Sequence, residues 1–398
     1  MSNLVSLSNA RPIVIGAGPA GLAATWTLKE AGLAPLVLDR AQFAFSTWTS
    51  YYPSLRMNSW RRLSHLPGMK LSAEFGPWPM RDDFANYLRK YVERLDPDVR
   101  YGTEVHRVDR EGGRWLVRSS IGDLATDHLV IATGLHRTTF VPDWPGLADF
   151  EGEFLHARDY TVPEPFAGKD VLVVGCGPTG IDIAVAAAAA GASRVRMSIR
   201  HNPLLFKLSP LTSLLSQSVK HAKMPPWLVN RVSLLMHRVQ WGDLSAYGLN
   251  PPVEGTMAGI ARSGHTYGSI DRGLVEAVRD GTVEIVRAVN AFDRKTVLLD
   301  GGTSIKPDTV IAATGQRPGL EGLLGHLGVL AEPGGRPLVH GGQTAPHAPG
   351  LYFTGFRVPS GQIPDMAVDA RAIARAVTGQ SRFSQGRFSQ RRLSRRWR

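Results

Sequence analysis

The sequence predicts an α/β fold made of two similar domains, with the second domain inserted into the first. A strand, a glycine turn and a helix occur twice along the chain. Two similar strand ends lie on either side of the second copy. The 398 residues, of which 43% are hydrophobic, suffice for about two buried cores.

The first copy of the repeat is PIVIGAGPAGLAATWTLKEAG, close to the N-terminus. Its apolar run predicts a buried parallel strand, and the G-x-G-x-x-G turn then opens an alanine-rich helix. Gly16 permits the tight bend, Gly18 lets the backbone approach a pyrophosphate, and Gly21 lets the helix pack on the strand. The helix would begin at Pro19 and Ala20 with its N-terminus facing the phosphates.

The second copy, DVLVVGCGPTGIDIAVAAAAAG, repeats this pattern with Gly175, Gly177 and Gly180. Its helix would begin at Pro178 and Thr179. A single glycine turn of this kind is a weak signal, but two copies in full strand-turn-helix context are not. The sequence therefore predicts two Rossmann-like dinucleotide-binding domains.

The end of the following strand differs between the two copies and separates the nucleotides. In the first copy Asp39, next to Arg40, is placed to accept bonds from ribose hydroxyls, which suits FAD or NAD. The matching position in the second copy is Ser198, and Arg200 and His201 follow it. Without a carboxylate, and with an arginine for a 2′-phosphate, the second site favours NADPH over NADH. The alternative is that the arginine lies at a solvated strand end.

The two similar strand ends are LVIATGLHR, with Thr133 and Gly134, and TVIAATGQRPG, with Thr314 and Gly315. Each predicts a buried strand that runs into a Thr-Gly turn beside a nucleotide, where the chain crosses between domains.

The predicted domains follow from these crossing points. Residues 1–148 and 306–380 form the FAD-binding domain, residues 149–305 the NADPH-binding domain, and 381–398 a basic, disordered tail. The second domain carries a helical insertion at about 204–240, read as two amphipathic helices. The insertion either packs on its own domain, which we favour, or forms a lid or channel for an apolar substrate.

Two further segments have recognisable patterns. Alternating residues between Gly102 and Asp127 predict antiparallel strands. The segment from Phe45 to Leu71 is irregular and rich in Trp, Tyr, Pro, Ser and Arg, and loops of this length often reach a functional site.

Composition restricts the compartment and the partners. Cys176 is the one cysteine, so the chain has no disulfide and no cysteine metal cluster, and no metal site is predicted. With no apolar run long enough to span a membrane, we expect a cytoplasmic protein.

The net charge restricts the class of partner. The formal net charge is +12, and the tail holds seven arginines and no acid, which leaves +5 for the rest. We therefore expect a small-molecule substrate and no nucleic acid. Weak membrane contact through the insertion or tail, and the oligomeric state, stay open.

The segment FEGEFLHARDY, between the two glycine turns, has the pattern F-x-G-x-x-x-H followed by an aromatic residue, which fits the fingerprint of the flavin-containing monooxygenases. The chain resembles this family from about Arg11 to Gly379, and most closely the plant YUCCA-type enzymes and their bacterial relatives. FVPDWPG, WLVNRVSLLMHRV, AYGLNPP and LYFTGF are also similar to family segments. The residues of the fingerprint are Phe150, Gly152, His156 and Tyr160.

The resemblance implies a reaction cycle. NADPH would reduce FAD, O₂ would add to the flavin C4a atom as a (hydro)peroxide, and one oxygen atom would pass to a small organic substrate. N- or S-oxygenation is the leading reaction, and YUCCA-like oxidative decarboxylation of a 2-oxo acid is the alternative. Baeyer-Villiger oxidation is disfavoured by Tyr160 and Thr161, and NADPH oxidase activity ranks behind as well.

The resemblance also implies site residues. In YYPSLRMNSW, Asn58 occupies the place of a family asparagine beside the flavin, where its amide can donate a hydrogen bond without supplying an acidic proton. Trp48 would stack near the flavin, although Thr49 replaces a common basic residue. The remaining expected FAD contacts are Val105, Gly355 and Gln362.

Two other classes compete with this interpretation. The pyridine nucleotide-disulfide reductases share the two-nucleotide architecture but need a pair of redox cysteines, and Cys176 is alone. A redox sensor that acts through the arginine tail is the non-enzymatic alternative, and intact nucleotide turns with Asn58 disfavour it.

Overall fold

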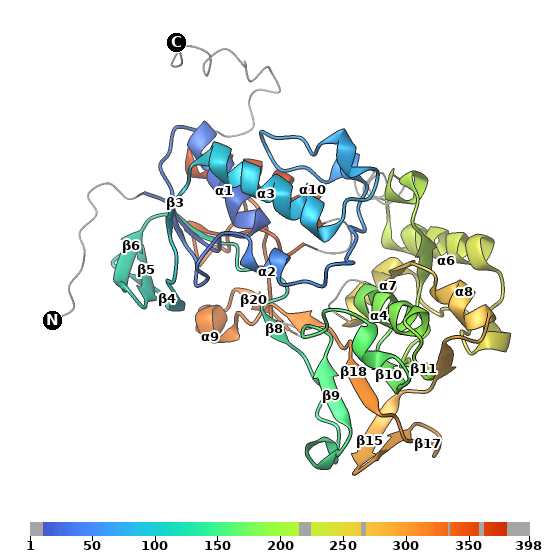
Figure 1. The fold of residues 1–398 in the computed structure, drawn as a ribbon. Coiled ribbons are helices and arrows are strands. Elements are labelled where there is room, and N and C mark those ends of the chain that lie inside the picture. Colours follow the sequence, from blue (N-terminus) through green and yellow to red (C-terminus); the bar gives the residue numbers. More distant parts are fainter. Residues whose placement is uncertain (1–10, 215–223, 264–267, 333–334, 358–361, 380–398) are drawn as a thin grey trace.

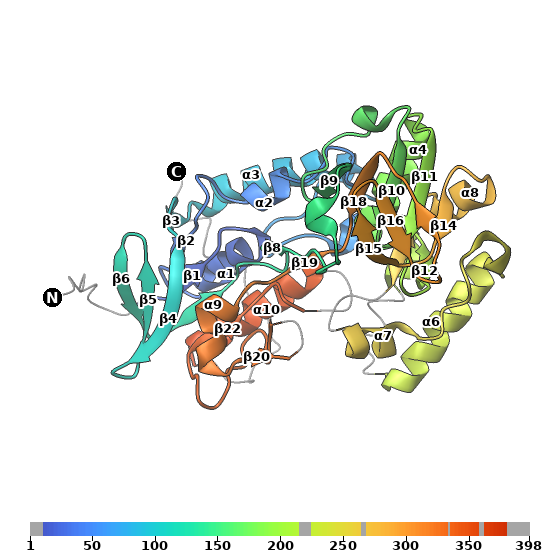
Figure 2. The same ribbon diagram turned by 90° about the horizontal axis from the view of Figure 1, so that it is seen from below.

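The computed structural model describes residues 11–214, 224–263, 268–332, 335–357 and 362–379. They form two lobes, each built around a five-stranded parallel sheet (Figure 1; Figure 2 shows the same lobes from below). Within the described ranges, no helix is both long and apolar enough to cross a membrane.

The first sheet has the strand order β22-β7-β1-β2-β3, and every neighbouring pair is parallel. All strands except the edge strand β3 are buried throughout, as expected for short apolar runs covered on both faces. The strands are β1 (Ile13–Ile15), β2 (Leu36–Leu38), β3 (Asp98–Arg100), β7 (Leu129–Ile131) and β22 (Leu351–Phe353).

Three helices lie together over one face of this sheet: α1 (Pro19–Glu30), α3 (Arg81–Leu95) and α10 (Gln362–Val377) (Figure 1). The hydroxyl of Thr27 donates to the Ala370 carbonyl at 2.8 Å and joins α1 to α10. The N- and C-terminal parts of the chain therefore share one core.

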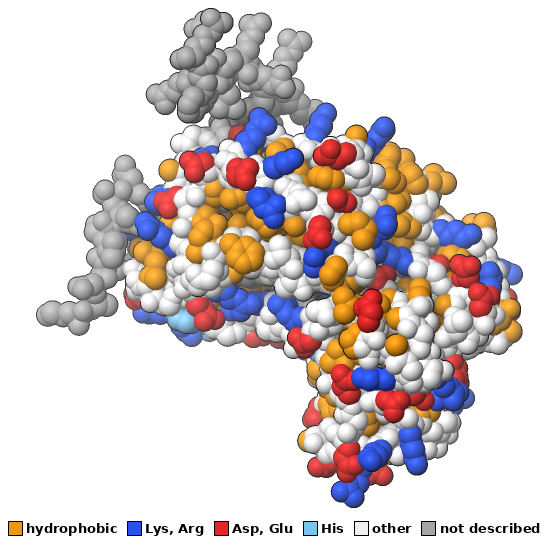
Figure 3. Space-filling model, viewed as in Figure 1, with side chains coloured by type: hydrophobic (Ala, Val, Ile, Leu, Met, Phe, Trp, Pro, Cys, Tyr) orange, Lys and Arg blue, Asp and Glu red, His pale blue; other side chains and the backbone are white. Residues whose placement is uncertain are grey.

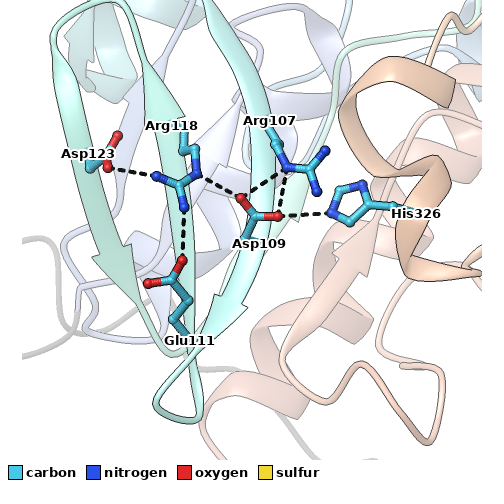
Figure 4. A network of polar contacts seen from close by, with 6 residues as sticks. All are labelled: Arg107, Asp109, Glu111, Arg118, Asp123 and His326. Atoms are coloured by element: carbon cyan, nitrogen blue, oxygen red, sulfur yellow. Dashed lines mark hydrogen bonds and ion pairs between the residues drawn. The ribbon is translucent and has the colours of Figure 1, made fainter.

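The other face is covered by an antiparallel sheet of β4 (Val105–Glu111), β5 (Arg114–Ser119) and β6 (Gly122–Thr126), which confirms the predicted strands. A charged network ties this sheet to the turn η6 (Gly325–Leu327) that follows α9 (Glu321–Leu324) (Figure 4). Asp109 accepts bonds from Arg107, Arg118 and His326, and Arg118 also binds Glu111 and Asp123.

The second sheet has the order β14-β11-β10-β18-β9, again with every pair parallel. The helices α4 (Pro178–Ala189) and α8 (Leu274–Arg279) pack against it. An antiparallel extension of β15 (Val289–Asp293), β16 (Thr296–Leu299) and β17 (Ser304–Ile305) carries acidic and basic side chains side by side (Figure 3). The main strands are β9 (Glu153–His156), β10 (Asp170–Val174), β11 (Arg194–Ser198), β14 (Glu284–Val286) and β18 (Thr309–Ala312).

The chain passes between the lobes twice, and the two passages pair with each other. β8 (Thr138–Thr139) is antiparallel to β19 (Gln316–Arg317). Since β18 lies between β10 and β9 in the second sheet, the predicted return to the first domain at residue 306 is one strand too early. An apolar strand with a Thr-Gly turn fits either sheet, so sequence alone did not separate them.

The insertion differs from the two helices predicted for it. Its first part contains β12 (Leu205–Lys207), which pairs in parallel with β13 (Ser269–Asp271). Leu205 is buried in the core of the second lobe, so this stretch packs as a strand and not as one face of a helix. Helical residues follow at 210–214, and the rest of the first predicted helix lies outside the described residues. The second predicted helix is present as α6 (Pro226–Trp241), beside α7 (Thr256–Ser263).

The segment from Phe45 to Leu71 is irregular, as predicted. It contains one short α-helix, α2 (Ser46–Thr49), and one 3₁₀ turn, η1 (Arg61–Leu63), and is anchored by the buried side chains of Met57, Leu66 and Leu71. The remaining short elements are η2 (Ala73–Phe75), η3 (Leu147–Asp149), η4 (Glu164–Phe166), η5 (Ser245–Tyr247), β20 (Leu330–Ala331) and β21 (Arg336–Pro337).

Candidate functional site

A single cavity of about 1500 Å³ runs across both lobes and is lined by both glycine turns. It also contacts the irregular loop, the Thr-Gly turns and the insertion. Two of the residues predicted to bind cofactor do not line it: Gly21, which lies under the first turn, and Gln362, whose side chain is outside the described residues. The predicted residues that line it are Gly16, Gly18, Pro19, Ala20, Asp39, Arg40, Trp48, Asn58, Val105, Thr133, Gly134, Gly175, Gly177, Pro178, Thr179, Gly180, Ser198, Arg200, His201, Thr314, Gly315 and Gly355.

The first glycine turn is closed underneath and open above. Gly16 has a φ of +107°, and a Cβ atom there would lie 2.5 Å from the carbonyl oxygen of Ala132. A Cβ atom on Gly21 would overlap the carbonyl oxygen of Gly16. A Cβ atom on Gly18 would meet nothing within 4 Å. The turn therefore leaves room for a ligand only on the cavity side, as a pyrophosphate cradle requires.

The N-terminus of α1 supplies donors to this cradle. No side chain caps the helix, so its first backbone N–H groups are left for a ligand. Gly355, which follows β22, lies very close to the start of α1. A Cβ atom on Gly355 would lie 2.8 Å from the Cβ of Ala20. The C-terminal segment thus reaches the same end of the cavity.

Asp39 is held at the end of β2 by two backbone donors. Its carboxylate accepts from Ala17 N at 2.5 Å and from Ala41 N at 2.8 Å. Each carboxylate oxygen keeps a second lone pair, and Asp39 lines the cavity. The carboxylate can therefore also accept hydrogen bonds from ribose hydroxyls. The residues of the first turn fit an FAD pyrophosphate and ribose.

The second glycine turn has nearly the same geometry. Gly175 has a φ of +113°, and its Cβ atom would lie 2.5 Å from the carbonyl oxygen of Ala313. A Cβ atom on Gly180 would overlap the oxygen of Gly175, whereas at Gly177 the space is open. The helix α4 also begins without a side-chain cap. The turn fits a second nucleotide.

The end of β11 differs from the end of β2. Ser198 is buried, and its hydroxyl donates to the Arg287 carbonyl at 2.9 Å, away from the turn. Arg200 and His201 follow and line the cavity. Burial, together with Arg262 and Arg200, lowers the pKa of His201, so a neutral imidazole stands beside the arginine near pH 7.

The two Thr-Gly turns bring polar groups to the cavity from both lobes. Thr133 Oγ1 is buried and has no hydrogen-bond partner among the described residues, which leaves it for a ligand. Thr314 Oγ1 donates to the Phe140 carbonyl and ties the second turn to the passage between the lobes.

The irregular loop brings Trp48 and Asn58 to the cavity wall. Trp48 packs edge-on against Phe84 at 4.6 Å, and its Nε1 donates to the Arg81 carbonyl at 2.9 Å. The orientation of the indole is therefore set by the protein itself.

The fingerprint residues His156 and Tyr160 have mainly structural contacts. His156 Nδ1 accepts from Arg158 N at 3.0 Å, so its Nε2 donates to the Gly315 carbonyl at 3.1 Å. Burial lowers the pKa of His156, which keeps the imidazole neutral. Tyr160 is buried against Phe166 and Tyr52. His156 thus connects β9 to the second Thr-Gly turn.

The thiol of Cys176 is unsuited to redox chemistry. Burial and the nearby Asp271 raise its pKa to about 12, so it stays protonated at neutral pH. Within the second turn, the backbone of Cys176 accepts a hydrogen bond from the Ser269 hydroxyl at 3.0 Å.

A group of polar side chains that was not predicted from the sequence connects the lobes beside Asn58. Tyr52 donates to Asp182 Oδ2 at 2.6 Å, and Arg272 approaches the same oxygen at 3.4 Å. Arg272 also donates to Asn58 Oδ1 at 2.7 Å. Asp182 on the nucleotide-binding helix was the available signal, because an acidic residue in an otherwise apolar helical stretch needs a partner.

More than half of the chain matches a known protein family. The family described as "Pyridine nucleotide-disulphide oxidoreductase" matches residues 13–224.

Curated relatives are plant monooxygenases. "Probable indole-3-pyruvate monooxygenase YUCCA9" of Arabidopsis thaliana is 33% identical over 77% of this chain and 75% of its own length. "Indole-3-pyruvate monooxygenase YUCCA1" of Oryza sativa subsp. japonica is 31% identical over 86% of each chain. Among solved structures, the flavin-containing monooxygenase from Stenotrophomonas maltophilia is 25% identical, with a TM-score of 0.70 over 93% of this chain and 98% of that one.

Proposed function

Because the chain belongs to the flavin monooxygenases of the pyridine nucleotide-disulphide oxidoreductase fold, close to the YUCCA-type enzymes, we propose that it oxidatively decarboxylates an apolar 2-oxo acid. It is an NADPH-dependent flavoprotein monooxygenase that uses FAD, NADPH and O₂. When bound, these cofactors supply the electrons and the activation of oxygen.

We assign FAD to the first turn and NADPH to the second. The carboxylate of Asp39 at the end of β2 suits a ribose with free hydroxyls, and Ser198 with Arg200 suits a 2′-phosphate. Asn58 donates a hydrogen bond at the reaction centre between them.

The charge of the cavity is the observation that carries the choice of substrate. Nine arginines and three acidic residues line its described part. The phosphates of FAD and NADPH use some of this positive charge, but a protonated amine finds little to stabilise it there. The 2-oxo acid reaction therefore ranks above the N-oxygenation that the sequence alone places first.

The cavity that Asn58 lines combines apolar and basic groups, as an apolar acid requires. Leu55, Phe206 and Met236 line the cavity, together with Arg56. The only side-chain hydrogen bond of the Arg56 guanidinium within the described residues is a long one of 3.4 Å to the Trp78 carbonyl. Arg56 is thus available for a substrate carboxylate.

The test supplies the FAD-loaded enzyme with NADPH, O₂ and indole-3-pyruvate, the substrate in the relatives' names. The balanced reaction converts the 2-oxo acid, O₂, NADPH and H⁺ into the acid one carbon shorter, CO₂, NADP⁺ and water. We expect one CO₂ for each NADPH. Arg56→Ala should raise KM about tenfold, as loss of a charge-assisted hydrogen bond does.

Arg231→Ala, on the outer surface of α6, is the matched control and should leave KM unchanged. Methyl phenyl sulfide tests the competing S-oxygenation. Sulfoxide formation at a higher kcat/KM than 2-oxo acid turnover would overturn the assignment of substrate while leaving the monooxygenase in place.

A further inference from the structure

A chain of polar contacts crosses from one lobe to the other beside the cavity. The irregular loop of the first lobe contributes Tyr52, Arg56 and Asn58, and the second lobe contributes Asp182 from α4 and Arg272 from the turn after β13. Arg272 stands at the centre, because its guanidinium reaches Asp182, the Arg56 carbonyl and Asn58.

The backbone that carries Arg272 is fixed on both sides. Before it, β13 pairs with β12. After it, Asp271 Oδ1 accepts from Val275 N at 3.0 Å and so holds the first turn of α8. The side chain of Arg272 therefore extends toward the first lobe from a rigid base.

The guanidinium is also held at its far end. The side chains of Arg272 and Asp182 are only 13% and 14% exposed, and Tyr52 donates to the same carboxylate oxygen. Burial and the charge of Asp182 raise the pKa of Tyr52, so the phenol keeps its proton and remains a donor. A buried charge pair with a third hydrogen bond has little freedom to rearrange.

This arrangement decides which way the Asn58 amide faces. A guanidinium can only donate, so the atom of Asn58 that meets Arg272 must be the oxygen. The amide nitrogen then faces away from Arg272, and it donates to no protein acceptor within the described residues. Asn58 is exposed and lines the cavity, so its N–H bonds are available to a group bound there.

We propose that Arg272 is a positioning residue that fixes the Asn58 amide with its N–H donors toward the cavity, and does so only when the two lobes are docked. The proposal rests on the proposed function, in which Asn58 is the donor. It adds that the donor of the first lobe is aimed by a residue of the second.

The first experiment measures the contact without cofactors. Thermal unfolding of the apoprotein is compared for the wild type, Asn58→Ala, Arg272→Ala and the double variant. We expect each single variant to lower Tm by about 1–3 °C and the double variant to lower it by less than the sum, because the pair interacts. Strictly additive shifts would overturn the contact between the two residues.

The second experiment measures the yield of product and of hydrogen peroxide for each NADPH oxidised. Arg272→Ala should lower the product yield about tenfold and release peroxide instead, while FAD content stays the same. Arg272→Lys keeps the charge but not the fork of donors, so it should recover the yield only in part. Arg279→Ala, a surface arginine on the adjacent helix, is the control that should behave as wild type.

Asn58→Asp separates the contact from the donor. The carboxylate still accepts from Arg272, so Tm should be kept, but the N–H donors are gone and the product yield should fall as in Asn58→Ala.

In the Asn58→Ala background, adding Arg272→Ala should change the yield no further. A further fall there would show that Arg272 acts independently of Asn58 and overturn the positioning role. A normal yield in Asn58→Ala would instead overturn the role of Asn58 in the proposed function, a result that the apoprotein experiment does not depend on.

Discussion

The two glycine turns have the same backbone and different side chains around it. Gly16 and Gly175 share φ angles within a few degrees and approach the neighbouring strand equally closely. The ends of the following strands differ. Asp39 accepts a hydrogen bond from a backbone N–H of its own turn, whereas the Ser198 hydroxyl is directed away from its turn and donates to the Arg287 carbonyl. We therefore infer that the turn provides a place for a pyrophosphate and that the following strand end selects the nucleotide.

The largest expected effect comes from filling the turn itself. Gly21→Ala should abolish FAD retention, because the new Cβ atom overlaps the Gly16 carbonyl oxygen. Gly180→Ala should keep FAD and weaken NADPH binding about tenfold or more, because the equivalent overlap lies in the other lobe. Flavin absorbance after gel filtration and NADPH titration measure the two effects. Loss of FAD from both variants would mean that the lobes do not act separately.

A smaller effect should follow from changing a strand end. Ser198→Asp places a carboxylate where the second site lacks one, so we expect KM for NADPH to rise about 50-fold by repulsion of the 2′-phosphate, and KM for NADH to change less than about threefold. Arg200→Ala should raise KM for NADPH about tenfold. In the first lobe, Asp39→Asn serves as the control, since it should weaken FAD binding and leave the NADPH preference intact. Equal changes for NADPH and NADH in Ser198→Asp would contradict the assignment.

The first lobe should lose stability in acid through a half-buried histidine. Burial and the neighbouring Arg357 and Arg336 lower the pKa of His340, in the first lobe, to about 4. Between pH 6.5 and 4 the unfolded chain therefore binds a proton that the folded chain does not, so stability falls as the pH falls through this range. His340→Gln should lose less stability over the same range in urea unfolding at pH 7 and pH 5. An identical loss in both proteins would exclude His340 as a source.

The smallest effect concerns the cysteine inside the second turn. With a pKa of about 12, Cys176 should resist iodoacetamide between pH 6 and 9, and Cys176→Ala should change kcat/KM for NADPH less than about twofold. Labelling followed by mass spectrometry measures the first expectation. Fast alkylation at pH 7 would show a reactive thiol and reopen the disulfide reductase alternative.

Local patterns allowed most of the fold to be predicted. Both strand-turn-helix units and the antiparallel strands from Val105 to Thr126 depend on neighbouring residues, so their sequences were sufficient. The membership of β18 was not predictable, since a short apolar strand carries no mark of the sheet it joins. β12 was read as helix because leucines near Leu205 satisfy both periodicities over so short a stretch.

The site was predictable to the same degree. Glycines, Asp39 and Asn58 carry a recognisable local context, and the structure brings them to one cavity. Arg272 has no such context, and it contacts Asn58 from a point 214 residues further along the chain. Contacts at that separation depend on how the lobes dock, which the local sequence does not encode.

The paired passages β8 and β19 make the second lobe a module with adjacent ends. The chain leaves the first lobe at Thr139 and returns at Gln316, and these two residues are partners in one antiparallel ribbon. Everything between them, including the second glycine turn, the strand end proposed to select the nucleotide and the insertion beside the cavity, enters and leaves at one place. A chimaera that takes this stretch from a relative needs only two neighbouring joints, so we expect nucleotide preference to be exchangeable as a cassette, without rebuilding the FAD site.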